Sequence, residues 1–564
     1  MHHGRSRSRR SPVAALGLAA LILVAGCAAP GDQPDTGATD PAPEQTAQPT
    51  PTPTPSPEPD PEPTLTWGPA ESDLAAATEV AEQMDDDELA GQVIIARYSG
   101  THPGEAAALV QAYHLAGVIL FAENITSTDQ VRDTAAAVQE RQAEMGRDWP
   151  AVISVDNEGG QVQRMSAESG DWTTFPPFAA AGAADPEAVS TAMAAMATEL
   201  RASGVTMNFA PVADVSIGAA DPTINMRAAG DDPQRVSETV RAALTGFAAG
   251  GVLTSVKHFP GHGALTVDSH DDLPVLDAGE QHLAERDLVP FADAIEAGAP
   301  MVMLGHIAAQ AWDEGVPATL SPRAYEVLRE DLGFTGVAIT DGLDMGALTA
   351  TRTSGQIAVE ALDAGADLLL TPADTAGAHA AIMAALEDGS LDRDRVQEAA
   401  GRVIALQRWQ AGLAEEAGEV DGGDVGSAAQ AARDLSAAAI TVAAGECSGE
   451  LVGPRLHLRG GTSADWTAFA EAAERAGLDV VPLEEPADTS IRLISAGTSA
   501  AGGDVAIALD GPWQLAGADA PTLIATHGRT AGSLEALVDV LTGAVDAPGR
   551  LAFAVEGLPA SACA

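Results

Sequence analysis

A short apolar run followed by an alanine-rich amphipathic segment is the unit that repeats between residues 70 and 410. The apolar runs have the length and composition of buried strands, and the segments between them have helical spacing. Strands that alternate with helices predict a parallel sheet. Eight repeats predict a (β/α)8 TIM-type barrel over residues 69–412, with a doubly wound open sheet as the alternative architecture. The eight runs are 91–99, 116–124, 150–160, 204–215, 251–261, 299–307, 336–345 and 365–374.

Polar side chains gather at the C-terminal ends of these runs. In a barrel of this kind the C-terminal ends of the strands form the catalytic face. We therefore expect these residues to converge on one site, although any single one of them could be a turn former. They are Asn124, Asp156, Asn157, Asn208, Asp214, Lys257, His258, His306 and Asp341.

A second pattern of short strands and helices follows the barrel. The amphipathic segment 391–410 should close the barrel, and the Gly- and acid-rich residues 413–430 read as a linker. Residues 431–564 then predict a smaller α/β sandwich domain. Its expected strands are 438–445, 455–461, 479–483, 491–497, 504–511, 521–528 and 551–557.

The first residues have the pattern of an export signal. Residues 1–26 join a basic start to a short apolar run that ends in small residues before Cys27, as in a bacterial lipoprotein signal peptide. Residues 27–68 are rich in Pro, Thr and acidic residues and predict an extended tether. We expect a lipid on Cys27 to anchor the protein to the outer face of the cell membrane, with a plain secretory peptide as the alternative.

Composition limits the possible partners. The formal net charge of −52 is spread along the chain, so the surface repels nucleic acid. A hydrophobic content of 46% allows a large core. Besides Cys27 the chain holds only Cys447 and Cys563, which could form a disulfide in an oxidising compartment or remain buried thiols.

The stretch "KHFPGHGALTVDSH", residues 257–270, holds the densest candidate chemistry. Lys257 is the only lysine of the chain. Asp268 and His270 can lie on the same side of an extended loop, where the carboxylate would orient the imidazole and raise its basicity. A solvated turn is the alternative. A zinc site of His258, His262 and His270 is disfavoured, because the interposed Pro and Gly residues prevent the helix that such spacing requires.

A second candidate is Asp341 in "AITDGLDM". It directly follows an apolar run, so its carboxylate should reach a ligand bound at the barrel mouth. Asp344 is the rival carboxylate, and its place farther into the loop favours a structural role. A carboxylate near an anomeric carbon, with a proton donor for the leaving oxygen, is what glycoside cleavage needs.

Together these motifs resemble glycoside hydrolase family 3, and within it the β-N-acetylglucosaminidase branch. The similarity rests on "VDNEGGQVQRM", "KHFPGHG", "DSH" and "ITDGLDM", in that order, within roughly residues 80–410. The two-domain lipoprotein layout is similar to the Gram-positive members. The resemblance implies that Asp341 is the nucleophile and that His270, paired with Asp268, is general acid and then base. It implies that the terminal sugar is bound by Asp156, Arg164, Arg227, Lys257 and His258.

The departures from the family pattern are small. The chain has "RAAG" after Met226 where relatives often have "RSFG", and Gly342 where many carry a second Asp. The first departure puts the surroundings of Arg227 in doubt, whereas the second leaves Asp341 in place.

The resemblance also implies an activity. It predicts a retaining hydrolase that works as a monomer without metal or cofactor and removes N-acetylglucosamine from cell-wall amino-sugar oligosaccharides or muropeptides. A phosphorylase that uses phosphate as acceptor and a β-glucosidase or xylosidase of the same family are the alternatives. A sugar-binding lipoprotein would share the layout but has no need of Asp341 with a His/Asp pair.

Overall fold

The computed structural model describes residues 63–269, 272–495 and 498–563. The predicted signal peptide, Cys27, most of the predicted tether and His270 lie outside the described residues. No helix within these ranges is long and apolar enough to cross a membrane.

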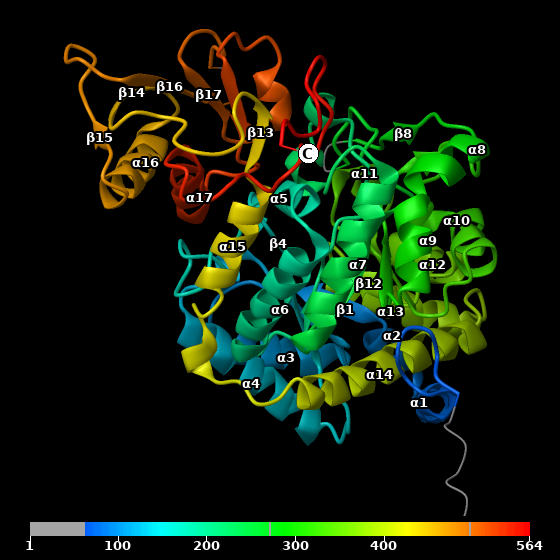
Figure 1. The fold of residues 1–564 in the computed structure, drawn as a ribbon. Coiled ribbons are helices and arrows are strands. Elements are labelled where there is room, and N and C mark those ends of the chain that lie inside the picture. The colour runs from blue at the N-terminus through cyan, green and yellow to red at the C-terminus, as the bar shows by residue number, and fades with distance from the viewer. Residues whose placement is uncertain (1–62, 270–271, 496–497, 564) are drawn as a thin grey trace, which may run out of the picture. The chain divides into compact units, whose positions relative to one another are not determined.

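Eight parallel strands form the first sheet, and each lies within one of the eight predicted runs (Figure 1). Neighbours along the chain pair with one another, and a parallel bridge between Ile339 and Leu368 joins the last two strands, which closes the barrel. The predicted (β/α)8 fold is therefore confirmed. The strands are β1 (Ile94–Arg97), β2 (Gly117–Leu120), β3 (Val152–Val155), β6 (Met207–Asn208), β7 (Leu253–Phe259), β9 (Met301–Leu304), β11 (Val337–Thr340) and β12 (Leu369–Leu370).

Helices follow the barrel strands and bury one apolar stripe each. In α7 (Pro233–Ala249) the stripe includes Val236, Val240, Ala243 and Phe247 at helical spacing. Burial of each large side chain contributes about 1.5–3 kcal/mol. Asp232 caps this helix, since its carboxylate accepts from the Arg235 N–H, and Pro233 fits the first turn.

The other helices of the barrel region include α14, which covers the predicted closing segment. They are α1 (Glu71–Gln83), α2 (Asp86–Gln92), α3 (Pro103–Tyr113), α4 (Thr128–Glu144), α5 (Phe178–Ala183), α6 (Pro186–Ala202), α8 (Glu280–His282), α9 (Val289–Glu296), α10 (Pro322–Glu326), α11 (Gly346–Thr349), α12 (Ser354–Ala364), α13 (Thr375–Asp388) and α14 (Arg393–Glu416).

Short elements occupy the loops. They are the strands β4 (Asn157–Gly159), β5 (Val162–Gln163), β8 (Val275–Leu276) and β10 (Ala308–Ala309), the 3-10 turns η1 (Ala122–Asn124), η2 (Gly218–Ala220), η3 (Asn225–Arg227), η5 (Ala318–Leu320) and η7 (Gly422–Asp424), and the π turns η4 (Leu283–Asp287) and η6 (Val327–Asp331).

A second sheet of six strands follows α15 (Ala429–Ala439), in the spatial order β13-β18-β17-β16-β14-β15. Only β13 runs antiparallel to its neighbour. Alternate residues face two different apolar clusters, as Ile507 and its neighbour Ala508 do, so the sheet is covered on both faces. The elements are β13 (Thr441–Ala444), β14 (Arg455–Gly460), α16 (Ser463–Arg475), β15 (Asp479–Val480), β16 (Thr489–Ile494), β17 (Val505–Ala508), η8 (Pro512–Leu515), β18 (Thr522–Ala525) and α17 (Ala531–Leu541).

One predicted strand of this half is wrong. Residues 551–557 form no strand, because their backbone groups bond elsewhere: the Leu551 N–H donates to the Ala560 carbonyl at 2.7 Å, and the Ala554 N–H donates to the Asp231 carboxylate at 2.8 Å. Phe553 is buried in the same apolar cluster as the barrel core. The segment therefore packs against the barrel instead of extending the second sheet. Residues 551–563 are called the C-terminal tail below.

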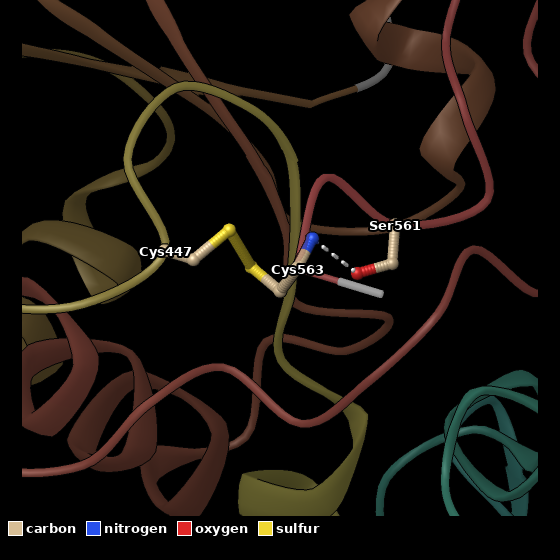
Figure 2. The surroundings of a disulfide bond; sticks show 3 residues. All are labelled: Cys447, Ser561 and Cys563. Carbon is tan, nitrogen blue, oxygen red and sulfur yellow. Dashed lines mark hydrogen bonds between the residues drawn. A yellow bond between two sulfur atoms is a disulfide. The ribbon is translucent and has the colours of Figure 1, made fainter.

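Cys447 and Cys563 form a disulfide, which decides between the two alternatives that the sequence left open (Figure 2). Their Cα atoms lie 5.3 Å apart. Beside the bond, the Ala562 N–H donates to the Val442 carbonyl at 2.8 Å, so a hydrogen bond joins the C-terminal tail to β13 and the disulfide joins it to the loop after β13.

Candidate active site

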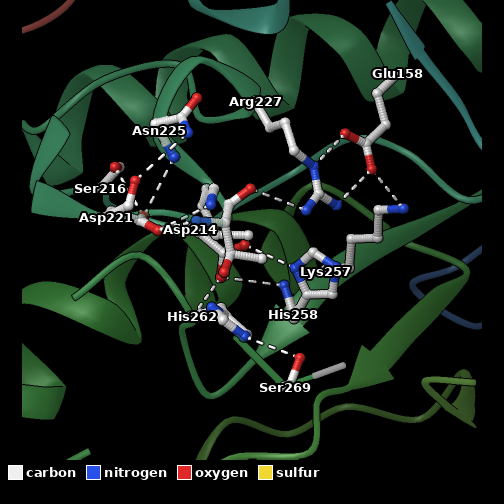
Figure 3. A network of polar contacts seen from close by, with 12 residues as sticks. Glu158, Asp214, Ser216, Asp221, Asn225, Arg227, Lys257, His258, His262 and Ser269 are labelled. Atoms are coloured by element: carbon white, nitrogen blue, oxygen red, sulfur yellow. Dashed lines mark hydrogen bonds and ion pairs between the residues drawn. The ribbon is translucent and has the colours of Figure 1, made fainter. Parts of the chain in front are cut away.

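The buried cluster at the C-terminal ends of the barrel strands centres on Lys257, in β7 (Figure 3). Its ammonium lies 2.7 Å from Asp156 Oδ1 and 2.7 Å from Glu158 Oε1. Arg227, on η3, holds the same glutamate with two parallel bonds of 2.9 Å from Nε and Nη2. Three of the five predicted sugar-binding residues are thus brought together: Asp156 contacts Lys257, and Glu158 joins Lys257 to Arg227.

Because this cluster is buried, the balance of its charges determines the protonation states of Glu158 and Lys257. Burial would raise the pKa of Glu158, but Arg227 and Lys257 outweigh it and hold that pKa well below its ordinary value. Burial would lower the pKa of Lys257, but Asp156 and Glu158 outweigh it, so the ammonium stays charged. The four side chains form a fixed array of two cations and two anions. Such an array can hold sugar hydroxyls without rearranging.

His258 belongs to a second network, built on Asp214. The carboxylate of Asp214 is fully buried and lies 2.7 Å from His258 Nδ1, and it also accepts from the His262 backbone N–H at 2.6 Å. Because Asp214 occupies Nδ1, the other ring nitrogen of His258 is the one that can meet a ligand.

His262 extends this network to the loop that carries the predicted dyad. Its Nε2 lies 3.1 Å from the hydroxyl of Ser269. Burial, aided by the nearby His258, lowers the pKa of His262 to about 4, so the ring is neutral at ordinary pH. His262 was left without a role by the sequence, and the structure makes it the link between His258 and the loop of Asp268.

Asp341 lies at the end of β11 and is partly exposed. Burial of the site would raise its pKa, but His258, His306 and the Gly342 N–H, 2.7 Å from Oδ1, lower the pKa to about 2. His306 also fixes the loop, since its Nε2 lies 2.8 Å from the Gly342 carbonyl. The carboxylate is therefore ionised and held in place, as a nucleophile must be.

Asp344 has structural partners, as expected. It accepts from the Thr371 hydroxyl at 3.2 Å and lies 3.4 Å from the Arg97 guanidinium. Arg164 follows β5 and is partly buried, and its Nε has no partner among the residues that the structure describes. Asp268 directly precedes Ser269, whereas His270 lies outside the described residues, so the pairing of these two side chains stays a prediction.

The sequence missed the role of Glu158 and gave none to Asp214. A signal for Glu158 was present: a lone buried lysine needs carboxylates, and Glu158 is the second acid of the loop that already supplied Asp156. The asparagines at the strand ends serve the backbone. The Asn124 amide donates to the Tyr98 and Gly100 carbonyls. The Asn208 side chain accepts from the Asn157 N–H and donates to the Asn157 carbonyl, and the Asn157 side chain accepts from the Met165 N–H.

Within the described ranges, no group of three His, Cys, Asp or Glu side chains is placed to hold a metal ion.

Comparison with known proteins gives a family for this site. A family model described as "Glycosyl hydrolase family 3 N terminal domain" matches residues 87–406. A "Beta-hexosaminidase A" of Pseudoalteromonas piscicida is 33% identical over 333 residues, which are 54% of this chain and 55% of that protein. The chain therefore spans about half the length of this relative. A "Beta-hexosaminidase" of Xanthomonas oryzae pv. oryzae is 39% identical over 263 residues, 45% of this chain and 76% of that protein.

A solved structure matches both halves of the fold. The glycoside hydrolase family 3 β-N-acetylglucosaminidase of Paenibacillus sp. str. FPU-7 superposes with a TM-score of 0.74 at 29% identity. The match covers 84% of this chain and 99% of that one, so the barrel and the second sheet occur together there as well.

Proposed function

The chain belongs to glycosyl hydrolase family 3, and from that premise we propose that it is an exo-acting β-N-acetylglucosaminidase that works by double displacement. The observation that carries the proposal is the ionised Asp341 at the end of β11, in the same strand-end site as Lys257 and His258. Two curated relatives of this chain, named β-hexosaminidases, supply the sugar class.

In the first step Asp341 attacks the anomeric carbon while a proton reaches the leaving oxygen, so a glycosyl-enzyme ester forms and the aglycone departs. His270, oriented by Asp268, is our candidate for the proton donor. In the second step the same histidine takes a proton from water, which attacks the anomeric carbon and releases Asp341. Two inversions retain the configuration of the sugar.

The array of Asp156, Glu158, Arg227 and Lys257, called the sugar-binding array below, would hold the non-reducing sugar. Asp156 and Arg227 lie on loops and Lys257 and His258 on β7, so together they approach a ligand from three elements. An ammonium has three donors, and Asp156 and Glu158 use two of those of Lys257, so one remains for a hydroxyl. Arg164, whose Nε is unpaired in the described structure, is the remaining candidate.

We further propose that the substrate is a cell-wall fragment with terminal N-acetylglucosamine linked β-1,4 to N-acetylmuramic acid. The support is the export pattern that ends at Cys27, since an enzyme tethered outside the membrane meets such fragments and meets water as the acceptor.

Product analysis tests the proposal. Aryl β-N-acetylglucosaminide and aryl β-glucoside are supplied in parallel, with and without phosphate, and the products are followed by proton NMR. We expect free β-N-acetylglucosamine in both buffers as the first-formed anomer and little turnover of the glucoside. A sugar 1-phosphate would identify a phosphorylase, a glucoside preference would identify a β-glucosidase, and initial α-anomer would exclude retention.

A further inference from the structure

Arg227 is the one member of the sugar-binding array that lies neither in a strand nor directly after one. It lies on η3, within the segment 216–231 between β6 and α7, and this segment is called the arginine loop below. The bidentate contact with Glu158 requires a specific position and orientation of the Arg227 guanidinium. Whatever holds the arginine loop therefore sets the place of Arg227 in the array.

Part of the loop is held by hydrogen bonds among its own residues. Asp221 is buried and accepts from the backbone N–H groups of Thr223 and Ile224 at 2.9 and 2.8 Å, which shapes η3 (Figure 3). The hydroxyl of Ser216 donates to the same carboxylate at 3.0 Å, and the Ser216 N–H donates to the Gly230 carbonyl at 3.0 Å. These bonds close the base of the loop but leave its end at Asp231 to be fixed by another element.

That element is the C-terminal tail. The Asp231 carboxylate accepts from the Ala554 N–H at 2.8 Å, and the Asp231 N–H donates to the Ala552 carbonyl at 3.4 Å. The fit at Gly230 is tight, because a β-carbon there would overlap the Ala552 carbonyl. The tail thus binds the arginine loop by two hydrogen bonds at Asp231, four residues from Arg227.

The other end of the loop meets the same half of the chain. Trp513, on η8, covers Gly218, where an added β-carbon would lie 3.2 Å from the indole ring. Phe553 packs edge-on against Trp513, with ring centroids 5.1 Å apart. Both ends of the arginine loop therefore rest on one aromatic pair and one short backbone segment of the C-terminal half.

The tail is itself anchored in the second sheet. The Ala552 N–H donates to His527 Nε2 at 3.3 Å, while His527 Nδ1 lies 3.1 Å from the Ala439 carbonyl. The disulfide between Cys447 and Cys563 fixes the end of the tail beyond this point.

We propose that the C-terminal half positions the sugar-binding array, with Asp231 as the positioning residue that transmits the placement of the tail to Arg227. The inference rests on the proposed function for its kinetic part, because it deepens the account of the same site. Its structural part, that the tail orders the arginine loop, holds for any ligand.

The test compares three variants of the full chain. Asp231→Ala removes the acceptor for the Ala554 N–H, whereas Asp231→Asn keeps an oxygen that can accept it. Asp232→Ala is the matched control, because the adjacent Asp232 accepts from the Arg235 N–H as the cap of α7. Loss of one hydrogen bond to a carboxylate should raise KM for an aryl N-acetylglucosaminide about tenfold in Asp231→Ala, with kcat changed less than about threefold.

The control and the conservative variant separate positioning from general destabilisation. Asp231→Asn should restore KM to within about threefold of the wild type, and Asp232→Ala should melt earlier with KM unchanged. Hydrogen–deuterium exchange should rise over residues 216–231 in Asp231→Ala alone. An unchanged KM together with unchanged exchange over these residues would overturn the proposal.

Two further outcomes remain decisive. If Asp231→Ala does not fold, Trp513→Leu loosens the opposite end of the loop, and the same rise in exchange over 216–231 and in KM is expected; neither rising overturns the proposal. If the wild type turns over no N-acetylglucosaminide, the proposed function fails, and the exchange measurement alone then decides whether the tail orders the loop.

Discussion

Lys257 lies between two carboxylates, 2.7 Å from each of Asp156 and Glu158, and is almost fully buried. A buried cation is costly unless it is paired, which gives a physical reason for acids in the loop after β3. The sequence pointed to Lys257 and Asp156 because both follow apolar runs. Periodicity did not point to Glu158, because the short hairpin of β4 and β5 turns that side chain inward and periodicity does not predict the direction of such a turn. The one signal for it was the need of a buried lysine for carboxylates.

The catalytic assignment at this scale is tested on Asp341. Replacing it by Asn removes the nucleophile while keeping the size of the side chain, so kcat/KM should fall at least about 1000-fold. Asp344→Asn is the matched control in the same loop. It loses only the contacts with Arg97 and Thr371, and we expect a fall within about tenfold. Hydrolysis of an aryl N-acetylglucosaminide measures both, and a larger loss in Asp344→Asn would reverse the assignment.

His527 gives a prediction for pH. The ring is fully buried between the Ala439 carbonyl and the Ala552 N–H, and burial lowers its pKa to about 4. In the unfolded chain His527 binds a proton near pH 6.5, whereas in the folded chain it binds one only near pH 4. Stability must therefore fall as the pH drops from about 6.5 to 4, by about 2–3 kcal/mol between pH 7 and 4.5 for this one ring.

Comparison with His527→Asn isolates that contribution. Asn tolerates the left-handed backbone at this position, where φ is 53°. His262 acts in the same direction and Asp287, whose pKa burial raises to about 6, in the opposite one, but both are common to the two proteins. The melting temperature, measured at pH 7 and 4.5, should fall less in the variant. Equal falls would show that this ring is not the group that titrates.

At the scale of elements, the prediction of the barrel succeeded because each of its strands is short, apolar and flanked by an amphipathic helix. The same reasoning failed at residues 551–557, where "LAFAVEG" has the alternation of a half-buried strand. Alternation of apolar and polar residues indicates that one face of a segment is buried. It does not indicate which groups form hydrogen bonds with the backbone of that segment. Here the partners are Asp231 of the arginine loop and His527, which are remote in sequence.

Asp367 joins three elements at the N-terminal end of β12. Its buried carboxylate contacts Arg329 on η6 and the two α14 residues Arg395 and Arg402, the latter two at 2.7 and 3.1 Å. These cations outweigh burial and hold the pKa of Asp367 well below its ordinary range, so the charge is present at all working pH values. The cluster lies at the strand end opposite Asp341, which predicts a role in stability and none in catalysis.

Asp367→Asn should therefore leave three guanidinium groups without their carboxylate and lower the free energy of unfolding by about 3–5 kcal/mol. The value of kcat/KM at 25 °C should stay within about twofold of the wild type. Asp363→Asn, on the exposed side of α12, is the control and should change stability by less than about 0.5 kcal/mol. Urea unfolding measures the first quantity, and a large loss of activity without loss of stability would contradict the structural role.

At the scale of the whole molecule, the two halves contribute differently to one site: the barrel supplies the ligand-facing groups, and the second half supports the arginine loop. The described groups that would touch a sugar come from the barrel loops and strands. The second half reaches the barrel at Gly218 and Asp231 through the arginine loop, and at α5, where the Ala183 carbonyl accepts from the Arg550 N–H at 3.1 Å. Such an arrangement makes the stability of the second half a condition for substrate binding.

The disulfide between Cys447 and Cys563 stabilises the second half covalently. It links two residues that are 116 positions apart, so the unfolded chain loses much of its freedom when the bond is formed. Cys447→Ser combined with Cys563→Ser should lower the free energy of unfolding by about 2–5 kcal/mol. Since Asp231 and His527 still hold the tail, we expect kcat/KM at 25 °C to stay within about threefold, whereas thermal inactivation should begin at a lower temperature. A reducing agent should shift the melting temperature of the wild type toward that of the double variant and leave the variant unchanged. Equal melting of oxidised and reduced wild type would show that the tail is held by its non-covalent contacts alone.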